Sequence, residues 1–307
     1  MVNLRQLAKK EERLGPGHRM CPGCPQTMIV RLVTKATDSP VVVANATGCL
    51  EVSTTIYPFS AWRVPWIHNA FENSAATISG VEAAYKALKK KGKIDKDVKF
   101  LVFAGDGGTY DIGLQSLSGA LERGHNFVYV CLDNEGYMNT GIQRSSATPF
   151  GAWTNTSQVG SILKGKQEFK KDLTSVVASH HIPYVAQASP SNVQDLFKKA
   201  KKAFETEGPA FINVLAPCVP GWKYPSEQSM EIARLAVDSC FWPLYEIENG
   251  KYTLNYDPGE KKIPIIKWLE KQKRFRHLLK PENQHIVEKL QQHVDAMWEN
   301  IKRLSEN

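Results

Sequence analysis

The chain has 307 residues, of which 42% are hydrophobic and 23% charged, and its formal net charge is +8. This composition excludes a globally disordered chain, and the length is sufficient to bury a sizeable core. No apolar run reaches the roughly 20 residues that a membrane-spanning helix needs, and the polar N-terminus lacks the apolar region of a secretory signal. We therefore expect a cytoplasmic protein that does not act at a membrane.

The positive charge has two interpretations that stay open. The lysines are scattered along helix-like stretches, and we find no basic module with interleaved aromatic residues, so we expect no binding to nucleic acid. The excess charge is then either a solvated basic surface or a surface of which part steers an acidic partner toward the protein.

Helical and strand patterns alternate along most of the chain. A loop with Cys21 and Cys24 comes first, and a helical pattern follows it at 27–37. Buried strands are predicted, in chain order, at 41–49, 99–108, 126–136, 182–188 and 209–218. Helices are predicted between them at 69–91, at 111–124 ending at Gly124, and at 191–208 with Ser191 or Asn192 as the cap.

This alternation predicts an α/β fold with a mostly parallel sheet flanked by helices. In such sheets the chemistry gathers at the carboxyl ends of the strands. Residues 1–240 are expected to form this domain. Residues 241–307 are rich in Lys, Glu, Gln and Trp, and we interpret them as a C-terminal helical arm. Its tryptophans, Trp268 and Trp298, pack either on a partner or back on the domain itself.

A Gly-rich loop follows the predicted strand 99–108. Gly105 and Gly107 permit a close backbone approach, and Asp106 offers the hard oxygen ligand that Mg²⁺ prefers beside phosphate. A helix starts soon afterwards, and its N-terminal amides favour an anion. Taken alone, Gly-Asp-Gly is equally compatible with an ordinary tight turn.

A second polar loop strengthens the assignment. Asp133, Asn134, Glu135 and Gly136 follow the next strand, and 26 residues separate Gly107 from Asn134, the length of one helix and one strand. Both loops then lie at one edge of the sheet and can share a metal. This arrangement resembles the thiamine-diphosphate motif. By that resemblance Asp106, Asn134 and the Gly136 carbonyl bind Mg²⁺, while Asp133 leaves open which side chain reaches the metal.

The six cysteines fall into two groups. Four lie in polar loops, and four thiolates suit iron–sulfur or zinc: Cys21, Cys24, Cys49 and Cys218. Cys131 and Cys240 lie in apolar surroundings, as buried free cysteines commonly do. A redox pair at Cys21 and Cys24 fits poorly, because the pair precedes the first strand.

Five segments together resemble the β subunits of pyruvate:ferredoxin oxidoreductases, within the 2-oxoacid:ferredoxin oxidoreductase family. They are HRMCPGC, ATGCLEVST, IHNAFENSAATISGVE, GDGGTYDIGLQSLSGALERGH and DNEGYMNTGIQRSSATP, and the likeness runs from about His18 to the last helix. The resemblance implies a thiamine-diphosphate-binding fold in residues 1–240, oxidative decarboxylation of a small 2-oxoacid or its reversal, and coenzyme A as co-substrate. Partner subunits of α, γ and δ type and ferredoxin as electron acceptor are implied as well.

The resemblance also assigns site residues. The four loop cysteines would hold a [4Fe–4S] cluster, and Asn139 would contact the substrate or the aminopyrimidine region as the catalytic residue. The cofactor would be bound by Gly48, Cys49, Gly105, Asp106, Gly107, Asn134, Gly136, Asn139 and Thr140.

Other candidates and functions remain open. Asn69 is a further polar candidate, His68 is either a base or a packed histidine, and the carboxylate at the pyrimidine is expected on another subunit rather than at Glu72. The alternatives to pyruvate are oxalate, 2-oxoglutarate or another 2-oxoacid. A non-redox thiamine enzyme and a structural zinc-binding module are alternatives of other kinds.

Overall fold

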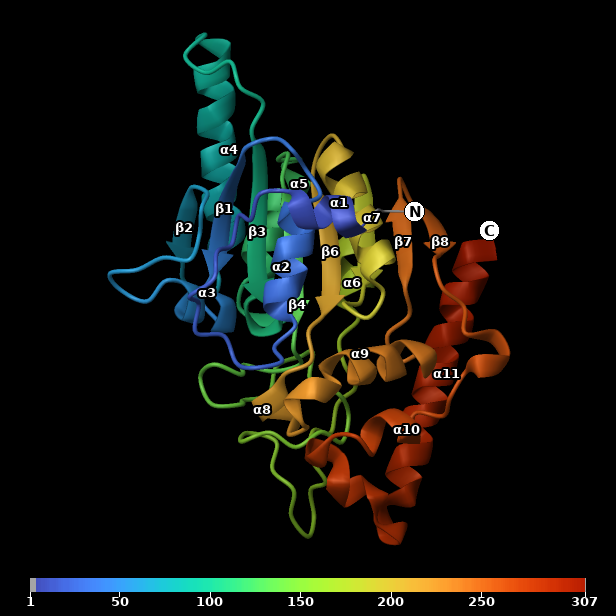
Figure 1. Ribbon diagram of the computed structural model, residues 1–307. Coiled ribbons are helices and arrows are strands. Elements are labelled where there is room, and N and C mark those ends of the chain that lie inside the picture. Colours follow the sequence, from blue (N-terminus) through green and yellow to red (C-terminus); the bar gives the residue numbers. More distant parts are fainter. Residues whose placement is uncertain (1–3, 307) are drawn as a thin grey trace.

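The computed structural model describes residues 4–306, which contain one eight-stranded sheet with the strand order β2-β1-β3-β4-β6-β5-β7-β8 (Figure 1). The strands are β1 (Val41–Ala46), β2 (Trp66–Asn69), β3 (Lys99–Gly105), β4 (Val128–Asp133), β5 (Tyr184–Ala188), β6 (Ala210–Leu215), β7 (Tyr245–Glu248) and β8 (Lys251–Leu254). The first six are parallel to one another, whereas at one edge β7 pairs antiparallel with β5 and β8 pairs antiparallel with β7. The prediction of a mostly parallel α/β sheet is therefore confirmed.

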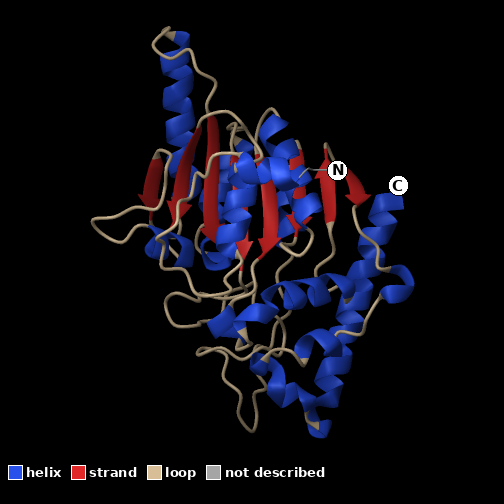
Figure 2. Ribbon diagram, in the orientation of Figure 1, coloured by secondary structure: helices blue, strands red, loops and turns tan. Residues whose placement is uncertain are grey.

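Helices cover both faces of the sheet (Figure 2). On one face the core contains residues of α1 (Leu4–Lys9), α2 (Gln26–Thr34) and α7 (Val193–Glu205). On the other face it contains residues of α4 (Ser74–Lys90), α5 (Leu114–Glu122) and α6 (Leu173–Ala178). The short α3 (Cys49–Thr54) follows β1 at its carboxyl end. Apolar residues at helical spacing on these helices meet apolar runs in the strands, so each face excludes water from a continuous core.

A third core lies beyond the carboxyl ends of the strands. It joins α8 (Val219–Trp222), α9 (Ser229–Asp238), α10 (Ile266–Leu269), the 3₁₀ helix η4 (Lys273–Leu279) and the long α11 (Gln284–Glu306). Trp268 is fully buried and Trp298 nearly so within this core. Of the two expectations for these tryptophans, packing on the chain's own domain is therefore the one observed.

Two differences from the predicted elements have local causes. The helix predicted from residue 69 begins at Ser74, because residues 66–69 pair with β1 as the edge strand β2. The chain after residue 240 first adds β7 and β8 to the sheet and reaches the long helix only afterwards. The division at residue 240 stays a prediction.

None of the helices within residues 4–306 is both long and apolar enough to cross a membrane.

Candidate active site

The loops that follow β1, β3 and β4 meet at one edge of the sheet, because these three strands are neighbours and parallel. Between the loops lies an open cavity with about 440 Å³ of empty space. Eight of the nine residues predicted to bind a cofactor line it: Gly48, Cys49, Gly105, Gly107, Asn134, Gly136, Asn139 and Thr140. The ninth, Asp106, is 1% exposed and lies behind this lining. The sheet edge thus assembles the residues that the sequence motifs indicated.

Two glycines of the first loop are required by close contacts. A Cβ atom on Gly107 would lie 2.2 Å from the ring of Tyr137, whose hydroxyl donates a 2.9 Å hydrogen bond to the Gly107 carbonyl. A Cβ atom on Gly108 would lie 2.8 Å from the carbonyl oxygen of Phe71. Residues Gly107–Asp111 form a single π-helical turn before α5 begins, a distortion frequently found at functional sites.

Oxygen atoms converge beside Asp106. The Asn134 side-chain amide presents one end at 2.9 Å from the Asp106 Oδ1 and 2.7 Å from the Gly136 carbonyl, and the other end at 3.2 Å from the Gln26 amide nitrogen. If that first end is the amide nitrogen, it donates to both oxygens. If it is the amide oxygen, three acceptors face one another and need a cation between them. Spacings near 2.9 Å are about those between adjacent ligands of Mg²⁺ with bonds of about 2.1 Å, so these residues fit the ion.

Two hydrogen bonds hold the Asp106 carboxylate in place, and its surroundings raise its pKa. Its Oδ2 accepts a short hydrogen bond from the Ser145 hydroxyl, and its Oδ1 accepts one from the Asn134 backbone amide at 3.3 Å. Burial, and next the neighbouring Asp133, raise the pKa of Asp106 well above its usual range. The ionised form therefore needs a positive charge beside it, which a bound cation would supply.

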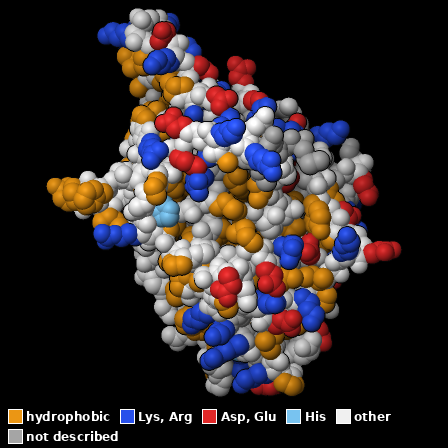
Figure 3. Space-filling model, viewed as in Figure 1, with side chains coloured by type: hydrophobic (Ala, Val, Ile, Leu, Met, Phe, Trp, Pro, Cys, Tyr) orange, Lys and Arg blue, Asp and Glu red, His pale blue; other side chains and the backbone are white. Residues whose placement is uncertain are grey.

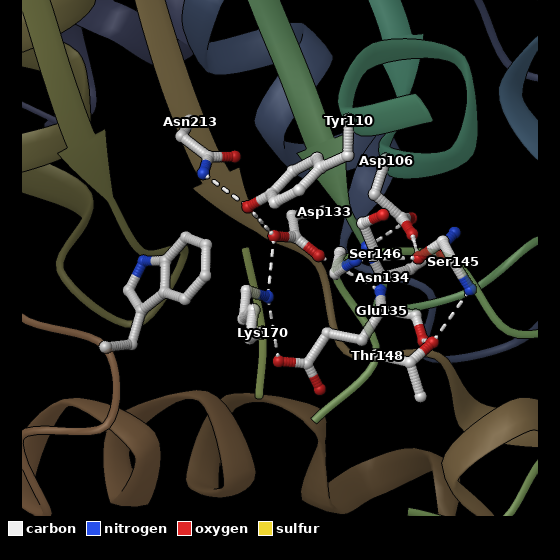
Figure 4. Close-up of polar contacts among 12 residues, drawn as sticks. Asp106, Tyr110, Asp133, Asn134, Glu135, Ser145, Ser146, Thr148, Lys170 and Asn213 are labelled. Carbon is white, nitrogen blue, oxygen red and sulfur yellow. Dashed lines mark hydrogen bonds and ion pairs between the residues drawn. The ribbon is translucent and has the colours of Figure 1, made fainter. Parts of the chain in front are cut away.

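A buried network determines which side chain of the loop 133–136 faces Asp106 (Figure 4). Asp133 accepts a 2.5 Å hydrogen bond from the Tyr110 hydroxyl and forms a 2.7 Å ion pair with Lys170. Lys170 also contacts Glu135 at 3.1 Å. Burial lowers the pKa of Lys170, but the two carboxylates outweigh it and raise that pKa overall. Asp133 is thus occupied by its own partners, and Asn134 presents its side chain to Asp106.

A second cation completes the network. Arg274 of η4 pairs with Glu135 at 2.5 Å and lies 3.9 Å from the centre of the Trp222 ring. Trp222 in turn donates a 2.8 Å hydrogen bond to the Asn134 carbonyl. Two acidic and two basic side chains therefore balance in charge, and they fix the backbone on both sides of Asn134. The distant segment that contributes Arg274 was not connected to this loop by any pattern in the sequence.

Of the four loop cysteines, Cys49 lines this cavity. Cys24 and Cys49 are half-buried, and burial raises the pKa of the first thiol to about 12 and of the second to about 11. Burial also raises the pKa of Cys218, and the other three cysteines, Cys21 included, add to that rise. The structure therefore brings the four within electrostatic range of one another, whereas Cys131 is buried within β4 and Cys240 within the third core.

Within residues 4–306, no three His, Cys, Asp or Glu side chains are grouped closely enough to hold a single metal ion. The assignment of the four cysteines to a cluster stays a prediction.

The remaining candidates differ in position. Asn139 and Thr140 are exposed in the cavity lining. His68 places its Nδ1 2.8 Å from the Glu51 carboxylate, and Asn69 is buried and donates to the Thr77 hydroxyl at 3.0 Å. Sequence reasoning missed several lining residues, namely Gln26, Asn45, Thr47, Phe71, Tyr137 and Met138. Asn45 and Thr47 lie at the carboxyl end of β1, so the rule that chemistry gathers at strand ends could have found them.

Comparison with known proteins defines the class to which this fold and site belong. Residues 46–214 match the family model "Thiamine pyrophosphate enzyme, C-terminal TPP binding domain". The matched segment runs from the end of β1 to β6 and therefore contains both polar loops around Asp106 and Asn134.

Full-length relatives narrow the class. The chain is 53% identical to pyruvate synthase subunit PorB of Methanocaldococcus jannaschii over 93% of this chain and 95% of that one. It is 52% identical to the subunit of the same name from Thermotoga maritima, over 99% of this chain and 97% of that one. Ketoisovalerate oxidoreductase subunit VorB of Pyrococcus furiosus is 44% identical to this chain, over 96% of this chain and 94% of that one. The chain therefore belongs to the family of thiamine-diphosphate-dependent 2-oxoacid oxidoreductase subunits that includes pyruvate synthase subunit PorB.

Among solved structures, 2-oxoglutarate:ferredoxin oxidoreductase from Magnetococcus marinus matches 73% of this chain and 79% of its own matched chain. The TM-score is 0.57 and the sequence identity is 21%, so this likeness supports the fold alone.

Proposed function

We propose that this chain is the β subunit of a CoA-dependent pyruvate:ferredoxin oxidoreductase acting in the cytoplasm. The complex would convert pyruvate to acetyl-CoA and CO₂, or run the reverse reaction, and pass the electrons through a [4Fe–4S] cluster to ferredoxin. The observation that carries the proposal is the convergence of the Asp106 carboxylate, the Asn134 side-chain amide and the Gly136 carbonyl at a cavity that Cys49 also lines. The names of the most similar relatives support pyruvate as the substrate.

The diphosphate end of the cofactor would lie against the Gly105–Asp106–Gly107 loop. Asp106, Asn134 and the Gly136 carbonyl would hold Mg²⁺, which binds phosphate oxygens alongside carboxylate and carbonyl ligands. Bound thiamine diphosphate supplies the carbanion chemistry by which a 2-oxoacid loses CO₂. Asn139 and Thr140, exposed in the cavity lining, would orient the substrate and the rest of the cofactor.

The four cysteines would hold the [4Fe–4S] cluster, which accepts electrons one at a time. The thiols need to lose protons on binding iron. Burial raises the pKa of Cys24, Cys49 and Cys218, so their ionised forms need a positive charge beside them. The iron ions themselves would supply that positive charge.

Other subunits would complete the enzyme. Thiamine enzymes generally divide the cofactor between two domains, and this chain has the diphosphate-binding half. We propose that partner subunits of α, γ and δ type supply the other half and the route for electrons to ferredoxin. A second candidate substrate is the branched 2-oxoacid 3-methyl-2-oxobutanoate (ketoisovalerate), because the VorB relative is also similar over nearly its full length.

Cysteine variants test the cluster. Replacing Cys21, Cys24, Cys49 or Cys218 with Ala should lower the iron, the sulfide and the broad visible absorption of the anaerobically purified complex by the share of one [4Fe–4S] cluster. Cys131→Ala and Cys240→Ala are the matched controls and should keep all three. A Cys218→Ala variant with a full cluster beside a Cys240→Ala variant without one would show that the fourth ligand is misassigned. Zinc without iron in the wild type would favour the structural zinc module instead.

A further inference from the structure

The side-chain amide of Gln26 meets that of Asn134 beside the candidate metal site. Gln26 is the first residue of α2 and follows the loop that contains Cys21 and Cys24. Its amide nitrogen lies 3.2 Å from the end of the Asn134 amide that points away from Asp106. Both residues line the same cavity. The two amides are therefore direct neighbours, although they come from opposite sides of the sheet edge.

Both amides are buried. Charged side chains of both signs are scattered over the surface in the space-filling view (Figure 3), whereas Gln26 is 4% exposed and Asn134 is 5% exposed. Within residues 4–306, the Gln26 Oε1 atom has no hydrogen-bond partner. Leaving a buried polar group without a partner is costly, so the groups beside each amide, and not bulk water, decide how it is oriented.

Two arrangements of the pair give a hydrogen bond between the amides. In the first, Asn134 donates to the Asp106 Oδ1 at 2.9 Å and to the Gly136 carbonyl at 2.7 Å, and it accepts from Gln26. In the second, both amides are reversed. The Asn134 oxygen then faces those two oxygens, and the Asn134 amino group donates to the Gln26 oxygen. Reversing one amide alone would place two donors or two acceptors against each other, so the orientations of the two amides are coupled.

A cation selects the second arrangement. It gathers three oxygens that otherwise repel one another, and Mg²⁺ prefers oxygen ligands of this kind. The first arrangement instead turns the Asn134 amino group toward the position of the metal. The metal-binding orientation also needs an acceptor behind Asn134, and the Gln26 side chain is the group that the structure places there. Partners of this kind orient the ligands of a metal and tune its affinity.

We propose that Gln26 is a positioning residue for the metal ligand Asn134. The two amides reverse together when the cation binds, and the Gln26 oxygen then accepts a hydrogen bond from the Asn134 amino group and holds the Asn134 oxygen toward the cation. The inference rests on the proposed function, because it takes Asp106, Asn134 and Gly136 as the ligands of Mg²⁺. It adds a residue outside the metal ligands that controls the affinity for the ion.

The backbone around Gln26 is fixed well enough for this role. The Ile29 amide donates to the Pro25 carbonyl at 3.0 Å and closes the first turn of α2. The Gly23 carbonyl accepts a 2.6 Å hydrogen bond from the Ser229 hydroxyl of α9. With the backbone held on both sides, rotation about the last side-chain bond is sufficient to reverse the Gln26 amide.

The test compares two substitutions of Gln26 in the purified complex from which thiamine diphosphate and Mg²⁺ have been removed. Isothermal calorimetry at a fixed concentration of thiamine diphosphate measures the Kd for Mg²⁺. Gln26→Met keeps the size of the side chain and removes the acceptor, so the Kd should rise about 10-fold or more. Gln26→Glu keeps an acceptor, so the Kd should stay at the wild-type value or fall.

Two controls accompany these variants. Gln291→Met removes a glutamine amide of α11 that hydrogen-bonds Ile265 and Asp295 instead, and it should leave the Kd for Mg²⁺ unchanged. The Asn134→Ala background has no amide to orient. In that background Gln26→Glu should bind Mg²⁺ no more tightly than Gln26→Met, and any remaining advantage of Glu would show that its charge attracts the ion directly.

That remaining advantage would overturn the proposal, and so would either of two further results. Wild-type Mg²⁺ affinity in Gln26→Met would show that Asn134 needs no acceptor behind it. Equal weakening in Gln26→Met and Gln26→Glu would show that Gln26 acts as a donor. If the wild-type complex shows no Mg²⁺-dependent binding of thiamine diphosphate, the proposed function itself fails, and this outcome is distinguishable because it does not depend on the substitutions.

Discussion

At the scale of single residues, the site depends on side chains that do not touch the cavity. Lys170 stands between the buried carboxylates of Asp133 and Glu135, and these flank the Asn134 amide that faces Asp106. Its role is positional, because it fixes the loop from behind. The sequence predicted Asn134 but provided no signal for Lys170, since 35 residues of irregular chain separate the two and no periodicity connects them.

Lys170→Met should destabilise the protein strongly. Removing one partner leaves two buried carboxylates facing each other, and such a change typically costs about 3–5 kcal/mol. The free energy of unfolding from urea denaturation of the isolated chain measures the effect. Lys267→Met is the control, because the Lys267–Glu270 pair is exposed and such pairs contribute little. Equal stability of the two variants would contradict the positional role of Lys170.

At the scale of elements, strongly apolar strands were predicted and short edge strands were not. The strands β1, β3, β4, β5 and β6 are almost fully buried, so their apolar runs are clear in the sequence. β2 has four residues of mixed polarity at an edge. β7 and β8 are joined by Asn249-Gly250, both with positive φ. This Asn-Gly turn is a strong hairpin signal that could have predicted the pair.

The N-terminal segment is attached to α2 by an ion pair that should respond to acid. Glu12 accepts hydrogen bonds from Arg31 at 2.8 and 2.6 Å and from Lys35 at 2.5 Å. The hydrogen bond from Arg31, opposed by burial and aided by Lys35, lowers the pKa of Glu12 to about 2. Because the folded pKa lies below the unfolded one, this stabilisation is present above about pH 4.5 and is lost as the pH falls toward 2.

Glu12→Gln should therefore lower the free energy of unfolding at pH 6 by roughly 1–2 kcal/mol, since hydrogen bonds to charged groups contribute about that much. The difference in the free energy of unfolding between this variant and the wild type should disappear as the pH approaches 2. Urea titrations of the isolated chain at several pH values measure it. If this difference in the free energy of unfolding stays constant over the range, the ionised carboxylate is not the stabilising form.

At the scale of the whole molecule, the sequence predicted the sheet and the cavity lining better than the core beyond the strand ends. Motif residues such as Gly107 and Asn134 lie in loops whose spacing follows the strand–helix–strand repeat, so their meeting was predictable. Arg274 reaches Glu135 across 139 positions, and its segment is a 3₁₀ helix with no clear apolar periodicity. Long-range contacts of this kind are set by tertiary packing, which local patterns do not record.

The central claim is that Asp106 binds the metal that holds the diphosphate. Isothermal calorimetry of thiamine diphosphate binding to the cofactor-free complex, with and without Mg²⁺, tests it most directly. We predict binding to the wild type only when Mg²⁺ is present, and to the exposed control variant Asp95→Ala with the same affinity. Asp106→Ala should show no Mg²⁺-dependent binding while its circular dichroism stays that of the wild type. Wild-type affinity in Asp106→Ala would contradict the account.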